Sequence, residues 1–166
     1  MLHHGSALLL VIAACAPRKP ADAPTGAMRD AEASAAAITL ERTACFGGCP
    51  VYRISVTPEG VVSYEGVAHV RQQGSVSTRI APKKVAALIS ELEHAGYFSF
   101  APSYTPAEPA CGRYATDSPT AITSVNNGTQ VHRIEHDYGC GSAPGALVVL
   151  ERRIDEALGS GEWTGR

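Results

Sequence analysis

Cysteines carry most of the chemistry that this sequence offers, and four of the five lie beyond residue 40: Cys45, Cys49, Cys111 and Cys140. If the domain is exported, an even number of cysteines predicts a disulfide framework, for which three connectivities exist. Two glycines between Cys45 and Cys49 allow the tight reversal that a disulfide needs. We favour this pair together with Cys111–Cys140, although crossed pairings such as Cys45–Cys111 stay open from the sequence alone.

Two other functions of the same cysteines, redox chemistry and zinc binding, are alternatives to structural disulfides. A thiol-disulfide redox protein places its reactive cysteine at a helix N-terminus, usually as C-x-x-C. Here the spacing of Cys45 and Cys49 is one residue longer, and Pro50 leads into a predicted strand. A zinc site needs two close pairs, whereas Cys111 and Cys140 are far apart in sequence. We therefore expect no metal and no other cofactor.

The histidines and carboxylates give little support for catalysis. His132 and His136 lie on a predicted strand, about 13 Å apart at ~3.3 Å per residue, which is too far to share a metal ion. We interpret both as solvated residues near a strand end, and His69 and His94 as isolated surface residues. The sequence has no nucleophile elbow and no Gly-rich phosphate loop before a helix. These observations favour a protein that is not an enzyme.

The N-terminal residues predict a cellular location rather than an activity. Residues 1–14 end in a short apolar run before Cys15, and Ile12-Ala13-Ala14-Cys15 resembles a bacterial lipobox. This resemblance implies a lipoprotein signal peptide, lipidation of Cys15 and a membrane anchor through the attached lipid. The segment before the apolar run lacks Lys and Arg. The alternative is therefore initiation at Met28, which gives a cytosolic protein.

Residues 15–37 are rich in Ala and Pro without apolar periodicity, so we interpret them as the lipidated cysteine followed by a disordered tether. Ala16 after the cysteine favours the outer membrane by resemblance, with the protein facing the periplasm. The net charge of −2 supplies no basic field for nucleic acid. The predicted localisation is the cell envelope, with an envelope protein or ligand as partner.

Residues 38–163 predict a single α+β domain. Alternation of apolar and polar residues predicts an antiparallel meander of four or five strands, and Asn127-Gly128 predicts a hairpin that ends near residue 136. The expected meander strands cover residues 38–43, 52–56, 62–64, 67–71 and 75–80.

Two amphipathic helices complete the predicted fold. Pro82 fits the first turn of one helix, which is expected to end at Gly96, and the second runs from Pro144 to Leu158 with Gly159 as its stop. Each helix has an apolar stripe of period 3.6. The fold class is therefore one antiparallel sheet, formed by the meander and the hairpin, with both helices packed on one face.

The segment from Thr43 to Tyr52 reads T-A-C-F-G-G-C-P-V-Y and resembles the signature of the domain of unknown function 6438. The later Tyr64-Glu65-Gly66 and Thr116-Asp117 also look like the family pattern. The resemblance implies an exported protein or lipoprotein and supplies no activity. It also implies that Cys111 and Cys140 are additions to the basic pattern, which fits their forming a separate pair.

These observations lead to one functional hypothesis and one alternative. We expect a non-catalytic domain, stapled by disulfides, that binds a protein, a peptide or a cell-wall ligand. The candidate contact surface consists of Phe46, Gly47, Gly48 and Asp117, because a stapled loop loses little entropy on binding. Packing of Phe46 onto the core is the structural alternative. The functional alternative is a redox protein or small envelope enzyme that uses Cys45 and Cys49.

Overall fold

A computed structural model describes Met1 and residues 36–166 of the chain. The predicted signal peptide, the lipidation of Cys15 and nearly all of the predicted tether lie outside the described residues. Within the part that the structure describes, no helix is long and apolar enough to cross a membrane.

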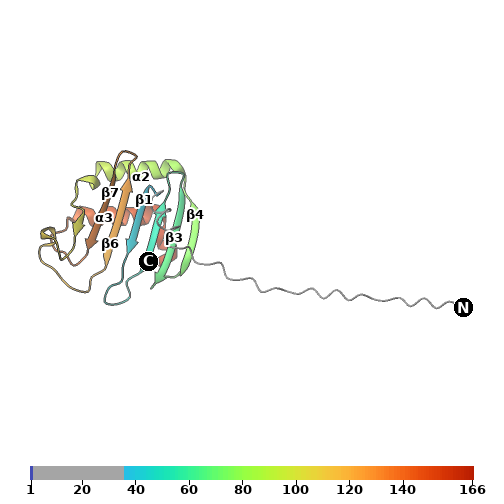
Figure 1. The fold of residues 1–166 in the computed structure, drawn as a ribbon, viewed down its shortest axis with the longest axis horizontal. Helices are drawn as coiled ribbons and strands as arrows, with labels where there is room; N and C mark the ends of the chain where they lie inside the picture. Colours follow the sequence, from blue (N-terminus) through green and yellow to red (C-terminus); the bar gives the residue numbers. More distant parts are fainter. Residues whose placement is uncertain (2–35) are drawn as a thin grey trace.

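A seven-stranded sheet forms the centre of the domain, in the order β4-β3-β2-β1-β6-β7-β5 (Figure 1). All neighbouring strands pair antiparallel except β5 and β7, which pair parallel. The predicted α+β class and the predicted hairpin are confirmed. The strands are β1 (Ile38–Arg42), β2 (Val51–Val56), β3 (Val61–Ala68), β4 (Gly74–Arg79), β5 (Ser103–Tyr104), β6 (Thr120–Asn126) and β7 (Val131–Asp137).

The meander has four strands, and the prediction of a separate strand over residues 67–71 is wrong. Residues 62–68 belong to one strand, β3, which continues past Gly66. A Cβ at Gly66 would lie 2.0 Å from the carbonyl oxygen of Gln72, so only glycine lets the returning chain approach this closely. The chain therefore turns at residues 69–73, later than the sequence pattern suggested.

The helices begin and end where the sequence predicted their boundary residues. Helix α2 (Pro82–His94) has proline in its first turn, and Gly96 follows it in the left-handed region. Helix α3 (Gly145–Leu158) ends at Gly159 with a φ of 77°, and the short helix α4 (Ser160–Thr164) follows at once. Residues 36–166 also contain two 3-10 turns, η1 (Tyr97–Ser99) and η2 (Pro109–Cys111).

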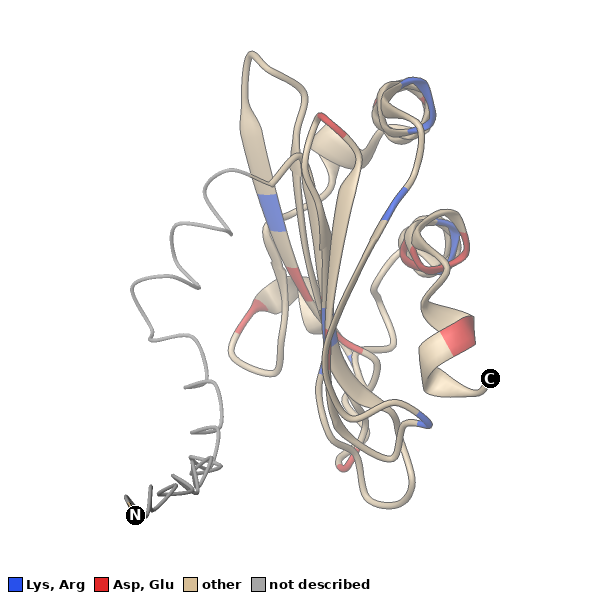
Figure 2. Cartoon of the chain, turned by 90° about the vertical axis from the view of Figure 1, so that its right-hand side faces the viewer, with Lys and Arg blue, Asp and Glu red and all other residues tan. Residues whose placement is uncertain are grey.

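The three helices of residues 36–166 lie on the same side of the sheet, and none of them covers the other face, which we call the open face (Figure 2). The strand residues that point toward the helices form the core, and Ile38, Ile54 and Ile134 are completely buried. Helix α3 adds Leu147 and Ile154. Residues 36–166 form the sheet, both long helices and the buried cluster. A fragment of these residues is therefore expected to fold by itself.

Candidate functional site

Both disulfides lie at one end of the sheet. In the antiparallel register β1 and β7 end there and β2 and β6 begin there. Cys45–Cys49 closes the β1–β2 loop with a Cα–Cα distance of 5.7 Å, and Cys111–Cys140 ties the segment before β6 to the turn after β7 with a Cα–Cα distance of 4.5 Å. The favoured pairing is confirmed, and the crossed alternative is wrong. We call residues 43–50, 111–119 and 138–142 the disulfide end.

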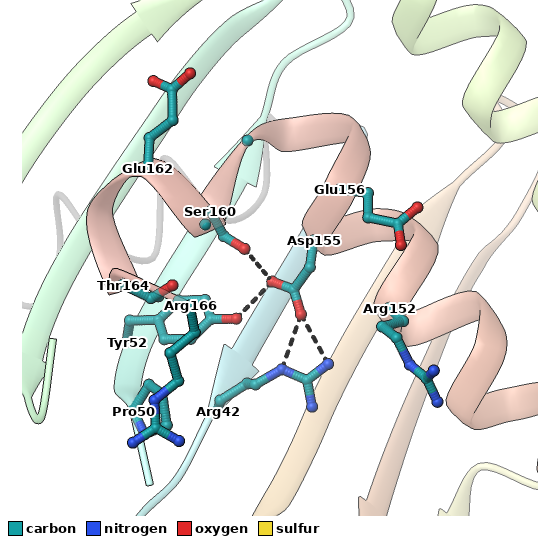
Figure 3. A pocket seen from close by; sticks show the side chains of 12 residues that line it. Arg42, Pro50, Tyr52, Arg152, Asp155, Glu156, Ser160, Glu162, Thr164 and Arg166 are labelled. Atoms are coloured by element: carbon teal, nitrogen blue, oxygen red, sulfur yellow. Dashed lines mark hydrogen bonds and ion pairs between the residues drawn. The ribbon is translucent and has the colours of Figure 1, made fainter.

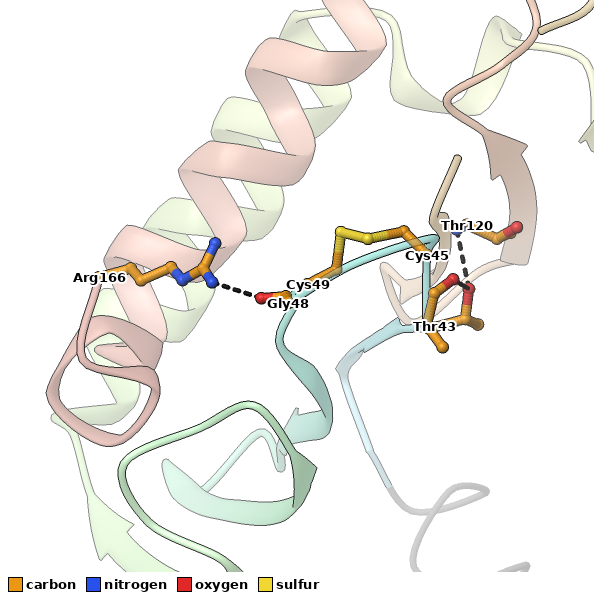
Figure 4. The surroundings of a disulfide bond; sticks show 7 residues. Thr43, Cys45, Gly48, Cys49, Thr120 and Arg166 are labelled. Carbon is orange, nitrogen blue, oxygen red and sulfur yellow. Dashed lines mark hydrogen bonds between the residues drawn. A yellow bond between two sulfur atoms is a disulfide. The ribbon is translucent and has the colours of Figure 1, made fainter. Parts of the chain in front are cut away.

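The loop of residues 43–50 is held by hydrogen bonds from two other parts of the chain, residues 117–120 and Arg166 (Figure 4). The Phe46 amide donates to the Asp117 carbonyl at 3.0 Å. The Thr120 amide donates to the Thr43 hydroxyl at 2.8 Å, as Figure 4 shows. On the other side, the guanidinium of Arg166 donates to the carbonyl of Gly48. The structure thus brings the predicted contact residues into one region, although Asp117 is distant in sequence.

The side chain of Phe46 is 90% exposed. The alternative that Phe46 packs onto the core is therefore wrong. Its neighbour Gly47 has a φ of 133°, which side-chain-bearing residues avoid, and Asp117 itself holds a φ of 68°. The conformation of the loop that carries the Phe46 ring is thus fixed by a disulfide, by backbone hydrogen bonds and by residues with restricted φ angles.

A cavity of about 490 Å³ borders this loop (Figure 3). Pro50, which directly follows Cys49, forms part of its wall, as does Arg166, which contacts Gly48. The remaining wall comes from β1, β2, α3 and α4. It includes Arg42, Tyr52, Arg152, Asp155, Glu156, Ser160, Glu162 and Thr164.

Asp155 lines the cavity and has a donor on each carboxylate oxygen. Arg42 donates from Nε and Nη2 to Oδ2 at 2.9 and 2.8 Å. Tyr52 and Ser160 donate their hydroxyls to Oδ1 at 2.5 and 2.7 Å. Because these bonds occupy the carboxylate, Asp155 fixes α3 against β1 and β2 and is not poised to act as a general base.

The polar network continues from Arg42 into the interior. Arg42 Nη1 donates to the Tyr138 hydroxyl at 2.9 Å, and this hydroxyl donates to Glu151 Oε2 at 2.6 Å. His136 Nδ1 donates to Glu151 Oε1 at 2.8 Å, and its ring stacks on Tyr138 with a centroid distance of 4.6 Å. Glu151 is 1% exposed, so these hydrogen bonds offset the cost of burying its carboxyl group.

The interpretation of His136 as a solvated residue is wrong. Strand alternation places His132, Ile134 and His136 on the face toward the helices, and His136 is 2% exposed. A histidine is accepted there because Glu151 on α3 supplies an acceptor. His132 is half-buried, with its Nε2 3.0 Å from the Phe100 carbonyl oxygen.

Sequence reasoning missed Glu151 and Asp155 altogether. A usable signal was present: Glu151 falls between Leu147 and Ile154 at helical spacing, and Asp155 follows it by four residues on the same side. An acidic pair inside an apolar stripe indicates buried partners. Among residues 36–166, however, no group of three or more His, Cys, Asp or Glu side chains is arranged to hold a metal ion.

Burial and neighbouring charges shift the ionisation of this network. Burial, opposed by Arg42 and reinforced by Glu151, raises the pKa of Tyr138 to about 12. Burial and the charge of Asp155 raise the pKa of Tyr52. Burial lowers the pKa of Arg42, but Asp155 and the two tyrosines more than offset this and keep its pKa above the ordinary value.

These shifts predict a loss of stability in alkali. A tyrosine whose pKa rises on folding, from ~10 in the unfolded chain, stabilises the fold fully below pH ~10. For Tyr138 that contribution disappears as the pH rises from about 10 to about 12. Tyr138→Phe should therefore flatten the fall of unfolding free energy over this range, measured by urea denaturation at a series of pH values. A fall as steep as that of the unmodified protein would contradict the assignment.

The described chain is an α+β domain with one helix-covered sheet and two disulfides at one end. Residues 36–158 match the family described as a domain of unknown function, DUF6438, and the chain belongs to this family. Comparison with curated proteins gives no match, and neither does comparison with solved structures.

Proposed function

We propose that the disulfide end is a non-catalytic binding surface for an envelope partner, of which an extended peptide fits best. The exposure of Phe46 on a stapled loop carries this proposal. A large aromatic side chain that a fixed loop holds in solvent is available to a partner, and aromatic anchors contribute strongly to interfaces. Because the loop is fixed before binding, little entropy is lost when Phe46 is covered.

The cavity beside the loop supports a peptide as the ligand class. Its volume of about 490 Å³ falls within the ~300–1,000 Å³ typical of ligand pockets. Its rim carries Arg152, Glu156 and Glu162, so both charge signs are present. A peptide docked with one apolar side chain on Phe46 offers amides and charged side chains to this rim. Cell-wall peptides have the same chemistry.

The hydrogen-bond network behind the cavity wall favours binding over catalysis, because both of its carboxylates are bonded to donors. Asp155 and Glu151 are both committed to donors, and the Ser160 hydroxyl donates to Asp155. A nucleophile needs an adjacent group that is free to accept its proton. This arrangement stabilises the wall of the cavity and supplies no such base.

The redox alternative has weaker support. Cys45 and Cys49 are half-buried in a surface loop, so a reductant could reach the bond. The residues after Cys49 are Pro50 and strand β2, however, and no helix begins at this loop. The helix dipole that stabilises a reactive thiolate is therefore missing at this position.

The cellular address remains part of the proposal. Lipidation of Cys15 and residues 15–37 as a tether would hold the domain of residues 38–163 at the periplasmic side of the outer membrane. The lipobox-like sequence and the two disulfides support this location, because disulfides persist in oxidising compartments. The exposed side chain of Phe46 would then be accessible to other components of the envelope.

The proposal predicts that replacing Phe46 weakens peptide binding without changing the stability of the fold. Peptides selected from a random displayed library on the immobilised 36–166 fragment should bind Phe46→Ala at least about tenfold more weakly, as expected for an aromatic anchor. Because Phe46 is 90% exposed, its replacement should change the unfolding free energy by less than about 0.5 kcal/mol. Fluorescence anisotropy of labelled peptides measures the affinity.

Val149→Ala is the matched control. Val149 is an exposed apolar residue on α3, at 59% exposure, and lies outside the disulfide end. It should leave peptide affinity unchanged. Equal affinity for the unmodified protein and for Phe46→Ala would show that the loop is not the binding surface. Pelleting with isolated peptidoglycan, compared for the same variants, tests the cell-wall ligand separately.

A further inference from the structure

The two edge strands of the sheet differ in length and in exposure. At one edge β5 has only two residues and is followed by the η2 turn. At the other edge β4 has six residues, all but Val76 exposed, in unbroken register with β3. Within residues 36–166 no other strand pairs with the outer side of β4.

The register identifies which backbone groups of β4 point outward. The Ile80 amide donates to the Gly60 carbonyl at 2.9 Å, so residue 80 faces β3. In an antiparallel pair, residues that bond to the neighbouring strand alternate with residues that do not. The N–H and C=O groups of Ser75, Ser77 and Arg79 therefore point away from β3 into solvent.

Natural sheets protect such edges with proline, lysine, bulges, very short strands or a covering element. Strand β4, with the sequence GSVSTR, has neither proline nor lysine, and its register shows no bulge. Its one charged residue, Arg79, is at the end of the strand. The edge is therefore able to pair with a further strand along its whole length.

We propose that β4 pairs with β4 of a second copy of this chain, antiparallel about a two-fold axis at Ser77. In this register Ser77 faces its own counterpart, and Ser75 of each copy faces Arg79 of the other. Each of these outward-pointing pairs exchanges two backbone hydrogen bonds. A second copy is the favoured occupant because the pattern of β4 is complementary to itself.

Charge and side-chain type fit the same register. The two Arg79 residues are offset by four residues along the strands, about 14 Å at ~3.4 Å per residue, so they do not repel strongly. On the open face, the register aligns hydroxyl side chains across five strands, and pairing continues this row through Ser77 into the second copy. The row consists of Ser124, Thr39, Ser55, Ser63 and Ser77.

Cysteine substitution at the axis gives the sharpest test. In hydrogen-bonded antiparallel pairs the Cα atoms are ~5.5 Å apart, within the range for a disulfide. All cysteines of the 36–166 fragment are paired, so Ser77→Cys supplies the only free thiol there. It should oxidise to a covalent dimer of doubled mass, at least tenfold faster than Val131→Cys. Val131 is the control because it is an exposed strand residue, at 64%, on β7.

Sedimentation of the fragment without added cysteine provides the second measurement. Because the contact is small, we expect reversible dimers only at high protein concentration. Ser77→Pro removes an amide that does not bond to β3, together with the side-chain bond from Ser77 to the Val62 carbonyl. It should abolish association and keep the fold, as circular dichroism can verify. A fragment that remains monomeric, dimers that persist in Ser77→Pro, or equal oxidation of both cysteine variants would each overturn the proposal.

Discussion

Replacing Cys111 and Cys140 together by alanine should lower the free energy of unfolding by about 4 kcal/mol. The two residues are 29 positions apart, and the chain-entropy relation for a loop of this length gives roughly this value. The pair also joins η2 to the turn after β7, next to His136 and Tyr138 of the buried network. Alanine is chosen because both cysteines are buried, at 2% and 5% exposure, where a serine hydroxyl would lack a partner.

The other disulfide is the matched control. Cys45 and Cys49 are only four positions apart, so the same relation gives about 2 kcal/mol for the loss of that bond. Urea denaturation of the 36–166 fragment measures both variants. A larger loss for the Cys45/Cys49 variant would contradict the view that Cys111–Cys140 holds the fold together while Cys45–Cys49 shapes the exposed loop.

Asp155→Ala should cost about 3 kcal/mol of unfolding free energy. The change leaves the Arg42 guanidinium without its carboxylate and takes the acceptor from Tyr52 and Ser160. Breaking one partner of a buried ion pair typically costs about 3–5 kcal/mol. The lower value applies here because the side chains of Arg42 and Asp155 keep 18% and 15% of their exposure.

An exposed ion pair on the same helix controls for charge alone. Arg153 on α3 contacts Glu91 on α2 at 2.8 Å, with side-chain exposures of 39% and 45%. Arg153→Ala should therefore cost less than about 1 kcal/mol. The double variant Arg42→Met/Asp155→Leu should recover only part of the loss, because it leaves no unpaired charge but still deprives Tyr52 and Ser160 of their acceptor. Equal losses for Asp155→Ala and Arg153→Ala would show that the network does not hold α3 to the sheet.

Local signals explain which parts of the fold the sequence could predict. Alternation placed β1, β2, β6 and β7, and Asn127-Gly128 placed the hairpin, because these patterns depend on neighbours in the chain. Strand β5 has only two residues and no pattern of its own, since it exists through parallel pairing with β7. The continuity of β3 depended on the close approach of Gln72 to Gly66, which is a tertiary contact.

The candidate site also has one part that local sequence predicts and another part that depends on tertiary contacts. Adjacent glycines indicated the Cys45–Cys49 loop, and the residue types indicated a contact surface there. The attachment of Arg166 to Gly48 and the packing of α3 over Arg42 join segments that are more than a hundred residues apart. No local pattern encodes such contacts, so the cavity beside the loop became visible only in the folded chain.

The most direct test of the binding proposal is an amide NMR titration of the 36–166 fragment with a peptide selected on it. We predict that chemical-shift changes concentrate in residues 43–50, in residues 113–118 and at Arg166. The open face of the sheet and helix α2 should change little. Shift changes centred on either of those surfaces, with residues 43–50 unaffected, would contradict the assignment of the disulfide end as the binding surface.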